Sequence, residues 1–466
     1  MVYRILSSNH VDQIVSTIQL LTQLVTSGGT PIADMLCRLV VAEFNAWPKL
    51  LSRYGRMRET EISQAVAKKR RLPDTPGIRP SAIEFLIAII EKASSANKEN
   101  ILTNRVFMRP IIKFLPLDSN TTVCNFVRCL HAHVLLDKKV PRKVKSAVFN
   151  MENILFKITS VHGQQKGSPE DQATRDDLIS QFLLEACTTY GNGVCYQDRG
   201  WYPPPLQSDQ ELGFQFYNGS LLRFITQLRP LDIGFHRDIL MAILRKCADL
   251  RSPYLESLSN PAQPGLSFAF ISQAALLQEI IALPLPAPFA IDPDLPDTPP
   301  PIEVVVENLM PALIDESYLT PIRGHESRLV RYALSQLVHA VLSKLKELQE
   351  ATRTGGEIWA GFLGEISAKL YGRLPEPSAL LKAYSQTSDS PLLSLSCLKI
   401  LLLYSEVFSG IQKLESKALG AALQSEWTIV TTADLLQRVL LLKLTEQNDE
   451  ITWWTRLSTN CVYAGC

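Results

Sequence analysis

Apolar residues recur at helical spacing along most of this chain. They follow one another at steps of three and four residues in two long stretches, Val11, Ile14, Val15, Ile18, Leu21 and Leu24, and Val330, Leu334, Leu337, Val341, Leu345 and Leu348. This spacing lines one face of an α-helix with apolar side chains. Because the alternation typical of β-strands is nearly absent, the pattern predicts an all-α protein.

The predicted helices are of moderate length and are separated by prolines and glycines, which interrupt helices. They include the segments 31–54, 121–136, 142–160, 176–188, 235–250, 267–283, 391–408 and 432–443. Amphipathic helices without a sheet to cover can bury their apolar faces by packing as antiparallel pairs. We therefore predict an irregular α-solenoid of armadillo/HEAT-like helical hairpins. An irregular helical bundle is the alternative, because no motif of about 40 residues repeats.

Two segments interrupt the helical pattern. The segment 190–205, YGNGVCYQDRGWYPPP, is rich in glycine, aromatic residues and proline, and it predicts a structured loop. The segment 283–303 contains the run LPLPAPFAIDPDLPDTPPP, with eight prolines and three aspartates, and predicts an extended linker or hinge. The expected organisation is therefore one helical-repeat segment over 1–282, a linker over 283–303 and a second helical-repeat segment over 304–466.

Composition excludes several classes of protein. Hydrophobic residues make up 46% and charged residues 20% of the 466 residues, which argues against a largely disordered chain. No apolar run reaches the length of about 18 residues that crosses a bilayer. The nine cysteines include no CxxC pair, which favours a reducing compartment over a disulfide framework.

Charge is distributed unevenly, although the net charge is only +1. From Arg38 to Lys157 there are 22 Lys and Arg against 10 Asp and Glu, whereas Ser252 to Ile322 holds nine acidic residues and no basic one. Such a basic region is typical of a protein that contacts a polyanion such as RNA, and a solvated helical surface is the alternative. Two compact blocks within it are candidates for RNA contact or nuclear import: Lys68, Lys69, Arg70 and Arg71, and Lys138, Lys139, Arg142, Lys143 and Lys145.

No pattern in the chain predicts catalysis or a cofactor. Cys124, Cys129, His131 and His133 are zinc ligands by type, but His131 and His133 would lie about 200° apart on one helix and could not converge on one ion. The segment 163–168, GQQKGS, lacks the Gly-Lys-Ser/Thr ending of a phosphate loop and follows no predicted strand, so we interpret it as a polar linker. We expect a non-enzymatic binding protein.

Several stretches together resemble a known family in their order, spacing and non-helical punctuation. They are FNAWPKLLSRYGR at 44–56, LPDTPGIRPSAIEFLIAII at 72–90, DKKVPRKVKSAVFN at 137–150, the loop at 190–205, NGSLLRFITQLRPLD at 218–232, SFAFISQAALLQEIIALPLP at 267–286, the stretch from VVENLMPALIDESY to HAVLSKL at 305–345, and LPEPSALLKAY at 374–384. They resemble the N-terminal region of the nucleolar pre-ribosomal-associated protein 1 family of large-subunit ribosome biogenesis factors. Residues after about 410 match little.

This resemblance implies a non-catalytic, helical-repeat scaffold in the nucleolus that takes part in early assembly of the large (60S) subunit and in rRNA maturation. Its implied partners are pre-rRNA, the early pre-60S particle and assembly factors that include a helicase and small nucleolar ribonucleoproteins. It implies no cofactor, membrane or small-molecule substrate, and members of the family are considerably longer than this chain.

Two alternatives remain open from the sequence. A nuclear transport receptor or another helical-repeat adaptor without RNA binding would share the helical pattern. Within the loop at 190–205, Trp201 and Tyr202 predict a docking point for protein or RNA, or else aromatic side chains that pack against neighbouring helices.

Overall fold

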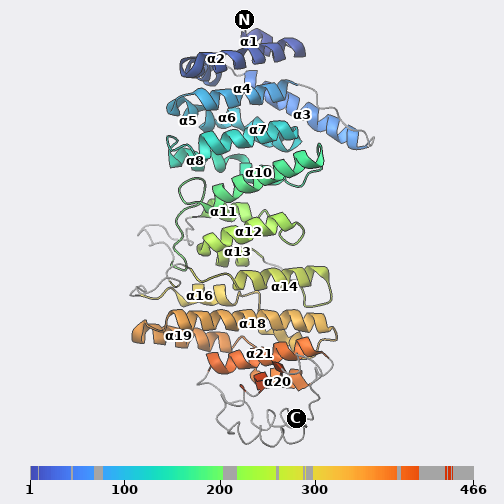
Figure 1. The fold of residues 1–466 in the computed structure, drawn as a ribbon, viewed down its shortest axis with the longest axis vertical. Helices are drawn as coiled ribbons and strands as arrows, with labels where there is room; N and C mark the ends of the chain where they lie inside the picture. The colour runs from blue at the N-terminus through green and yellow to red at the C-terminus, as the bar shows by residue number, and fades with distance from the viewer. Residues whose placement is uncertain are drawn as a thin grey trace, which may run out of the picture. The chain divides into compact units, whose positions relative to one another are not determined.

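The computed structural model describes residues 2–8, 10–43, 46–67, 77–202, 218–258, 262–286, 289, 298–385, 390–408 and a few positions between 436 and 443. These residues form α-helices joined by short turns, and no β-strand occurs among them, which confirms the predicted all-α class (Figure 1). The chain divides into two compact units. The first comprises residues 1–197 and 217–228, and the second comprises residues 198–216 and 229–466.

The first unit contains helices α1 to α11. Their bounds are α1 Val2–Leu6, α2 Val11–Glu43, α3 Ala46–Ala67, α4 Ile78–Lys92, α5 Ser95–Thr103, α6 Arg105–Phe114, α7 Asn120–Leu130, α8 Arg142–Phe149, α9 Ile154–Thr159, α10 Pro169–Thr188 and α11 Gly219–Ile225. Within this unit α2 packs against α4, α4 against α7, and α7 against α10, so successive long helices form successive layers (Figure 1).

Aromatic side chains fill the core between the layers of the first unit. Trp47 of α3 is completely buried. Its ring lies 5.3 Å from the ring of Phe85 in α4 and is stacked on Phe107 of α6 at 5.9 Å. A large aromatic ring shared by three helices buries much apolar surface at one point. It therefore ties α3, α4 and α6 together.

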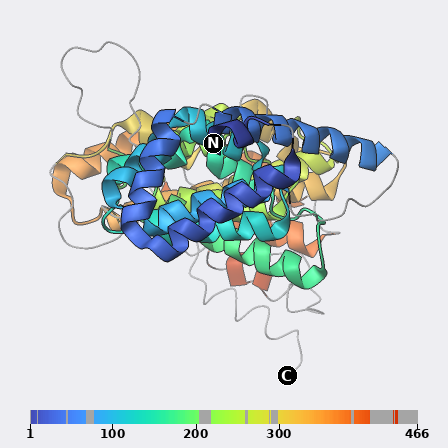
Figure 2. The same ribbon diagram turned by 90° about the horizontal axis from the view of Figure 1, so that it is seen from above.

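Helix α2 is bent at Gly29. This residue has φ 62° and ψ −155°, a conformation that glycine adopts without steric cost, and Pro31 follows it. Proline is tolerated there because the first turn of the segment after the bend has no helical hydrogen bond to lose. Figure 2 shows the two segments of α2 meeting at an angle. The bend lies between the apolar stretch that begins at Val11 and the helix predicted over 31–54. In the structure this predicted helix is divided between the second part of α2, which ends at Glu43, and the start of α3.

Side chains of the sequence set several helix starts. Ser168 caps α10, because its side-chain oxygen accepts a hydrogen bond from the Asp171 backbone N–H. The Asp171 carboxylate in turn accepts a hydrogen bond from the Ser168 backbone N–H, and Pro169 occupies the first turn. This reciprocal arrangement satisfies two donors that a helix end leaves open. The helix predicted over 176–188 therefore begins earlier, at Pro169.

The described helices of the second unit are α12 to α14 and α16 to α21. Their bounds are α12 Gly234–Lys246, α13 Arg251–Ser257, α14 Phe268–Ile281, α16 Ile302–Leu309, α17 Glu316–Leu319, α18 Arg328–Ala351, α19 Gly356–Tyr371, α20 Pro377–Ser385 and α21 Pro391–Val407. Helix α18 is the centre of this unit, because α14 and α21 both pack against it. Helix α19 packs against α16, and α20 packs against α21.

The structure divides the chain near residue 198, whereas the sequence predicted a linker over 283–303. Helices on both sides of that segment pack on each other inside the second unit, since α14 contacts α18 and α13 contacts α16. The two predicted helical-repeat segments, 1–282 and 304–466, and a hinge over 283–303 stay predictions. None of the described helices combines the length and apolar character needed to span a membrane.

Candidate nucleic-acid interface

The second basic block lies on the turn that joins α7 to α8. After α7 the chain makes a short π-helical turn, His131–Leu135, and Pro141 then starts α8. We call residues 137–143 the lysine turn. The first basic block, Lys68 to Arg71, lies outside the described residues and stays a prediction.

The carboxylate of Asp137 holds the lysine turn in shape. One oxygen accepts a hydrogen bond from the backbone N–H of Lys139 at 2.8 Å, and the other accepts from the ammonium of Lys98 in α5 at 3.1 Å. Partial burial alone would raise the pKa of Asp137, but these bonds and charges outweigh it and keep the pKa below its usual value. The carboxylate is therefore committed to the turn and to its ion pair with Lys98, although the charge of Lys139 also acts on it.

The five basic residues of the block have different surroundings. The side chains of Lys138, Lys139 and Lys143 are exposed to solvent. Lys145 is only 5% exposed, and its ammonium donates a hydrogen bond to the Leu135 carbonyl at 2.6 Å. Burial lowers the pKa of Lys145. A phosphate could therefore reach the three exposed lysines, while Lys145 is occupied inside the unit.

Arg142 is committed to the loop that follows α10. Its guanidinium carbon lies 4.7 Å from the ring centre of Tyr190 and 4.1 Å from that of Tyr196, and Nη2 donates to the Cys195 carbonyl at 3.0 Å. A guanidinium between two aromatic faces is attracted to both. Arg142 thus fastens residues 190–196 to the start of α8. Because Arg142 and Lys145 are both occupied inside the unit, the predicted phosphate contacts that remain exposed are Lys138, Lys139 and Lys143.

Replacing Arg142 by alanine is expected to loosen residues 190–197 and to lower the unfolding free energy of the first unit by about 1–2 kcal/mol, because two cation–π contacts and one hydrogen bond are lost. Hydrogen exchange of the backbone amides in 190–197 measures the effect. Lys143→Ala, one residue away and exposed, is the matched control and should leave exchange unchanged. Equal exchange in both variants would contradict this role for Arg142.

Two basic residues that the sequence did not single out lie at the same end of the first unit. Asp34 of α2 accepts a hydrogen bond from the backbone N–H of Ser94 at 2.8 Å, so the exposed Lys92 at the end of α4 lies close to α2. Arg38, one turn after Asp34, is exposed and contributes to keeping the pKa of Asp34 low. Helix α5 begins directly after this contact and is bonded through Lys98 to the lysine turn.

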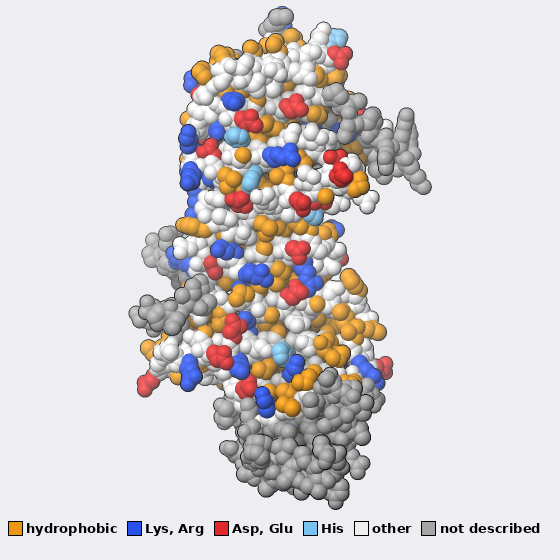
Figure 3. All heavy atoms as spheres, viewed as in Figure 1, with side chains coloured by type: hydrophobic (Ala, Val, Ile, Leu, Met, Phe, Trp, Pro, Cys, Tyr) orange, Lys and Arg blue, Asp and Glu red, His pale blue; other side chains and the backbone are white. Residues whose placement is uncertain are grey.

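These contacts bring Arg38 and Lys92 to the end of the unit that carries the lysine turn. Figure 3 shows Lys and Arg side chains along this edge of the first unit, at the level of α5 and α8. The exposed carboxylates of Glu91 and Glu99 also occur there, so the edge is predominantly but not uniformly basic. Periodicity alone could not reveal the grouping, because these residues come from three separate helices and a turn.

The second half of the loop at 190–205 packs inside the second unit. Trp201 is 2% exposed, and its ring lies 5.1 Å from that of Phe289. Tyr202 stacks on the same Phe289 ring, and its hydroxyl donates to the Thr298 carbonyl at 3.1 Å. Burial raises the pKa of Tyr202 to about 12. These contacts favour the alternative in which the two aromatic side chains pack within the protein, while residues 203–205 lie outside the described residues.

Comparison with known proteins places this arrangement in a family. Residues 1–273 match the Npa1 family, described as Ribosome 60S biogenesis N-terminal. The chain belongs to the Npa1 family. The match includes the lysine turn, Arg38, Lys92 and the loop at 190–205. It confirms the resemblance predicted from the sequence, and the family is one of 60S ribosome biogenesis and of no known enzyme class.

A curated relative agrees with the family assignment. The nucleolar pre-ribosomal-associated protein 1 of Saccharomyces cerevisiae is 23% identical over 350 residues, which cover 72% of this chain and 19% of the yeast protein. This Npa1-family chain therefore spans about a fifth of the length of that relative, and the match supports a nucleolar location. A crystal structure of an engineered protein aligns over 97% of this chain and 98% of its own, with 10% identity and a TM-score of 0.27, which is too low to indicate a shared fold.

The cysteine and histidine cluster of this Npa1-family chain is part of its helical packing. Cys124 and Cys129 are buried, and burial raises the pKa of Cys129 to about 12. The ring of His131 lies 2.8 Å from the Glu185 carboxylate, whereas His133 lies 4.0 Å from Glu91. The two histidines thus face different partners. Within the described ranges, no three His, Cys, Asp or Glu side chains form a group that could hold a metal ion.

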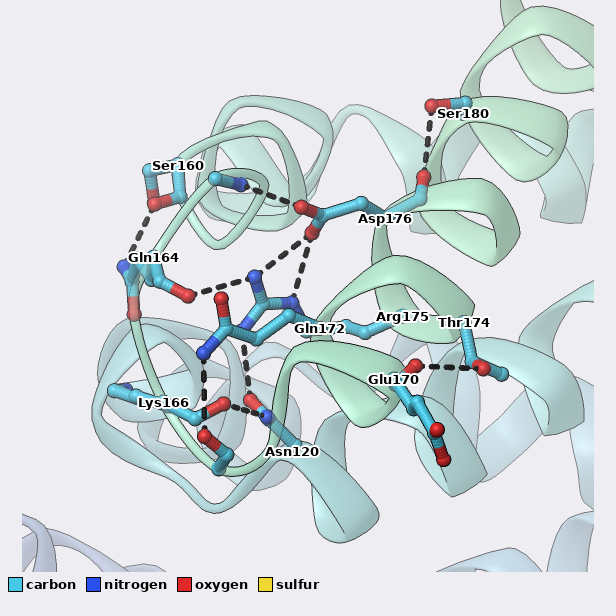
Figure 4. Close-up of polar contacts among 12 residues, drawn as sticks. Asn120, Ser160, Gln164, Lys166, Glu170, Gln172, Thr174, Arg175, Asp176 and Ser180 are labelled. Carbon is cyan, nitrogen blue, oxygen red and sulfur yellow. Dashed lines mark hydrogen bonds and ion pairs between the residues drawn. The ribbon is translucent and has the colours of Figure 1, made fainter.

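The polar segment 163–168 is bound by side chains of α7 and α10. Arg175 donates hydrogen bonds to the Gln164 carbonyl at 2.8 Å and to Asn120 Oδ1 at 2.7 Å, and Nε bonds to Asp176 at 2.9 Å (Figure 4). The amide of Asn120 donates in turn to the Lys166 carbonyl. The carbonyl groups of Gln164 and Lys166 are thus hydrogen-bonded to side chains of the protein itself. These bonds support the interpretation of the segment as a linker.

Proposed function

We propose that this chain is a non-catalytic scaffold in early assembly of the large ribosomal subunit and in rRNA maturation in the nucleolus. The observation that carries the proposal is the match of residues 1–273 to a family of 60S biogenesis. A scaffold acts by holding partners at fixed positions, and this action requires surface and rigidity rather than reactive groups.

The packing inside each unit supports a scaffold. Layered helices such as α2, α4, α7 and α10 bury their faces against neighbouring layers and leave their ends and connecting turns at the surface. This is the packing logic of an α-solenoid, in which extended edges are available to partners. We propose an irregular armadillo/HEAT-like α-solenoid as the arrangement that the scaffold uses.

The lysine turn is the part of the scaffold that we propose for pre-rRNA. Lys138, Lys139 and Lys143 are exposed, while the neighbouring carboxylate of Asp137 is bonded to Lys98 and to the turn itself. Lysine ammonium groups contact phosphates without reading sequence, and each contact adds salt-dependent affinity. Arg38 and Lys92 extend the surface, and Lys68 to Arg71 remain a proposed site of RNA contact or nuclear import.

The proposed partners are pre-rRNA, the early pre-60S particle and assembly factors, including a helicase and small nucleolar ribonucleoproteins. The yeast relative is named a pre-ribosomal-associated protein, which supports the particle as a partner. The alternative function is a nuclear transport receptor or another helical-repeat adaptor without RNA binding. RNA binding by the lysine turn distinguishes the two.

Replacing Lys138, Lys139 and Lys143 together by glutamine is expected to weaken binding to structured rRNA fragments about 10- to 100-fold at 0.1 M salt. It should also reduce the slope of log affinity against log salt by about 2–3, because each lost phosphate contact removes 0.7–0.9 of that slope. Electrophoretic shift titrations of the full chain at increasing salt measure both quantities.

The matched control replaces three exposed lysines of the second unit, Lys246, Lys382 and Lys399, by glutamine and so makes the same change in net charge. The control should retain the wild-type slope. Equal losses in both triple variants would show binding through general charge alone and would contradict a site at the lysine turn. Absence of RNA binding by the wild-type chain would support the adaptor function.

A further inference from the structure

Tyr190 presents an open aromatic ring beside the lysine turn. The side chain is 55% exposed, although the guanidinium carbon of Arg142, a residue of that turn, lies over its ring at 4.7 Å from the ring centre. Arg142 covers one face of the ring, so the other face is open to solvent. Tyrosine is enriched where proteins bind partners, because it combines a large apolar face with a polar hydroxyl.

The loop around Tyr190 holds the ring in place. Gly191 has φ 89°, a left-handed conformation that favours glycine, and it turns the chain directly after Tyr190. Gly193 lies so close to the Ala186 carbonyl of α10 that there is no room for a Cβ, and the Val194 backbone N–H donates to the same carbonyl at 3.1 Å. The loop is thus folded back onto the end of α10, and Tyr190 is positioned before any partner arrives.

Tyr190 is the exposed member of a packed group. The guanidinium of Arg142 also lies over the ring of Tyr196, which is half-buried, and the hydroxyls of Tyr196 and Ser146 lie 3.4 Å apart. The backbone N–H of Tyr196 donates to Asn218 Oδ1 at 2.7 Å. Because Tyr190 is supported by residues that are themselves held, little conformational freedom is lost when another planar group stacks on its open face.

The charge around the open ring is mainly positive. Lys143 follows Arg142 directly and Lys139 precedes it by three residues, and both lysines are exposed. Exposed carboxylates on this edge of the unit belong to Glu91 and Glu99, against five exposed basic residues, Arg38, Lys92, Lys138, Lys139 and Lys143. The ring therefore stands next to a surface that favours an anionic partner.

The carboxylates closest to Tyr190 along the chain are engaged within the protein. Glu185 accepts a hydrogen bond from the Asn192 amide at 3.3 Å and lies 2.8 Å from the ring nitrogen of His131. Asp198 accepts hydrogen bonds from two backbone N–H groups within the second unit. Neither carboxylate is left without a partner beside the ring.

An open aromatic face beside lysines matches one kind of polyanion. Single-stranded RNA carries phosphates that bind lysines and planar bases that stack on aromatic side chains. In an RNA duplex the base faces are already stacked on one another, so a duplex can use the lysines but not the ring. An acidic peptide supplies charge without a planar group on each unit.

We propose that Tyr190 stacks on an unpaired base of RNA whose neighbouring phosphates bind the exposed lysines of the lysine turn. The inference rests on the proposed rRNA contact of that turn and deepens it, because it assigns the site to single-stranded segments. It also moves the aromatic contact within the loop at 190–205 from Trp201 and Tyr202, which are packed in the second unit, to Tyr190.

Two fluorescein-labelled RNAs test the proposal, an oligouridine of about ten nucleotides and a duplex of about ten base pairs. Fluorescence anisotropy with the full chain at about 0.1 M salt gives both affinities. Tyr190→Leu should weaken binding of oligouridine at least about fivefold and leave binding of the duplex unchanged, because only the stacked base is lost. The salt slope should stay at the wild-type value, since no phosphate contact is removed.

Two further variants separate stacking from other effects of the substitution. Tyr190→Phe keeps the ring and should bind oligouridine within about twofold of the wild-type chain. Tyr332→Leu is the matched control, because Tyr332 is an exposed tyrosine of the second unit, and it should leave both affinities unchanged. Equal losses for oligouridine and the duplex in Tyr190→Leu would show a loosened loop rather than stacking and would overturn the proposal.

Photocrosslinking locates the base without any substitution. An oligouridine that carries 4-thiouridine should crosslink to the peptide that contains Tyr190, as identified by mass spectrometry. Crosslinks to the first unit that leave this peptide unmodified would overturn the proposal.

The same measurements distinguish failure of this inference from failure of the proposed function. Wild-type affinity of Tyr190→Leu for oligouridine would assign Tyr190 to packing on Arg142 or to a protein contact and would overturn the inference. The rRNA contact of the lysine turn would still stand if replacing its three exposed lysines by glutamine weakens binding of both RNAs. A wild-type chain that binds neither RNA would overturn both.

Discussion

Replacing Arg175 by methionine is expected to lower the free energy of unfolding of the first unit by about 3–5 kcal/mol. The Arg175 side chain is completely buried and bonds to Asn120, the Gln164 carbonyl and Asp176 (Figure 4). Methionine keeps the length of the stem but removes every donor. The Gln164 carbonyl and the amide oxygen of Asn120 would lose these hydrogen bonds, and the Asp176 carboxylate would lose its ion pair.

Chemical denaturation of the full chain, with hydrogen exchange to localise the effect, measures this change. Exchange should accelerate first in the linker 163–168 and at the start of α10, because Arg175 joins these segments to α7. Arg128→Met is the matched control, since Arg128 lies in the same unit on the exposed side of α7, and its effect should stay within about 0.5 kcal/mol. A similarly small effect of Arg175→Met would mean that the network contributes little.

Replacing Trp201 by alanine is expected to destabilise the second unit by about 3–5 kcal/mol, the cost typical of emptying a buried aromatic site. Trp201 packs against Phe289, and the Phe289 ring lies 6.0 Å from Trp359 of α19, so the cavity would open within a cluster of three aromatic rings. Trp201→Phe should cost much less, because Trp201 Nε1 has no hydrogen-bond partner among the described residues.

Thermal and denaturant unfolding of the full chain tests the role of Trp201, with exchange of α19 amides as the local signal. Ile358→Ala is the control, because Ile358 lies in α19 but is 65% exposed. Packing predicts a large loss for Trp201→Ala and a small one for Ile358→Ala. If Trp201→Ala instead retains full stability and loses affinity for rRNA fragments, the docking role holds.

The sequence predicted helices well where apolar spacing continues without interruption. The stretch from Val330 to Leu348 lies inside α18, and the segment predicted over 391–408 corresponds to α21. Boundaries were less accurate where local side chains decide them. The start of α10 was placed too late because its first turn is polar and is held by Ser168 and Asp171 rather than by apolar contacts.

The surroundings of the second basic block, Lys138 to Lys145, could not be predicted from the sequence. The sequence places five basic residues around Pro141, but it cannot say which of them the protein itself uses. Lys145 is 5% exposed, and the turn before the block presents the Leu135 carbonyl to its ammonium. The guanidinium of Arg142 packs against the rings of Tyr190 and Tyr196, which are about 50 residues away in the chain, so it is not available to a partner.

By itself, the sequence determined the helical class and the identity of the family, because periodic apolar positions and the order of characteristic segments are local properties of the chain. Only the tertiary structure decided which charged and aromatic side chains remain available to partners. Burial and hydrogen bonding depend on residues that are distant in sequence, as for Arg142 and Trp201. The starts of α18 and α21 likewise become neighbours only because the two helices pack in parallel.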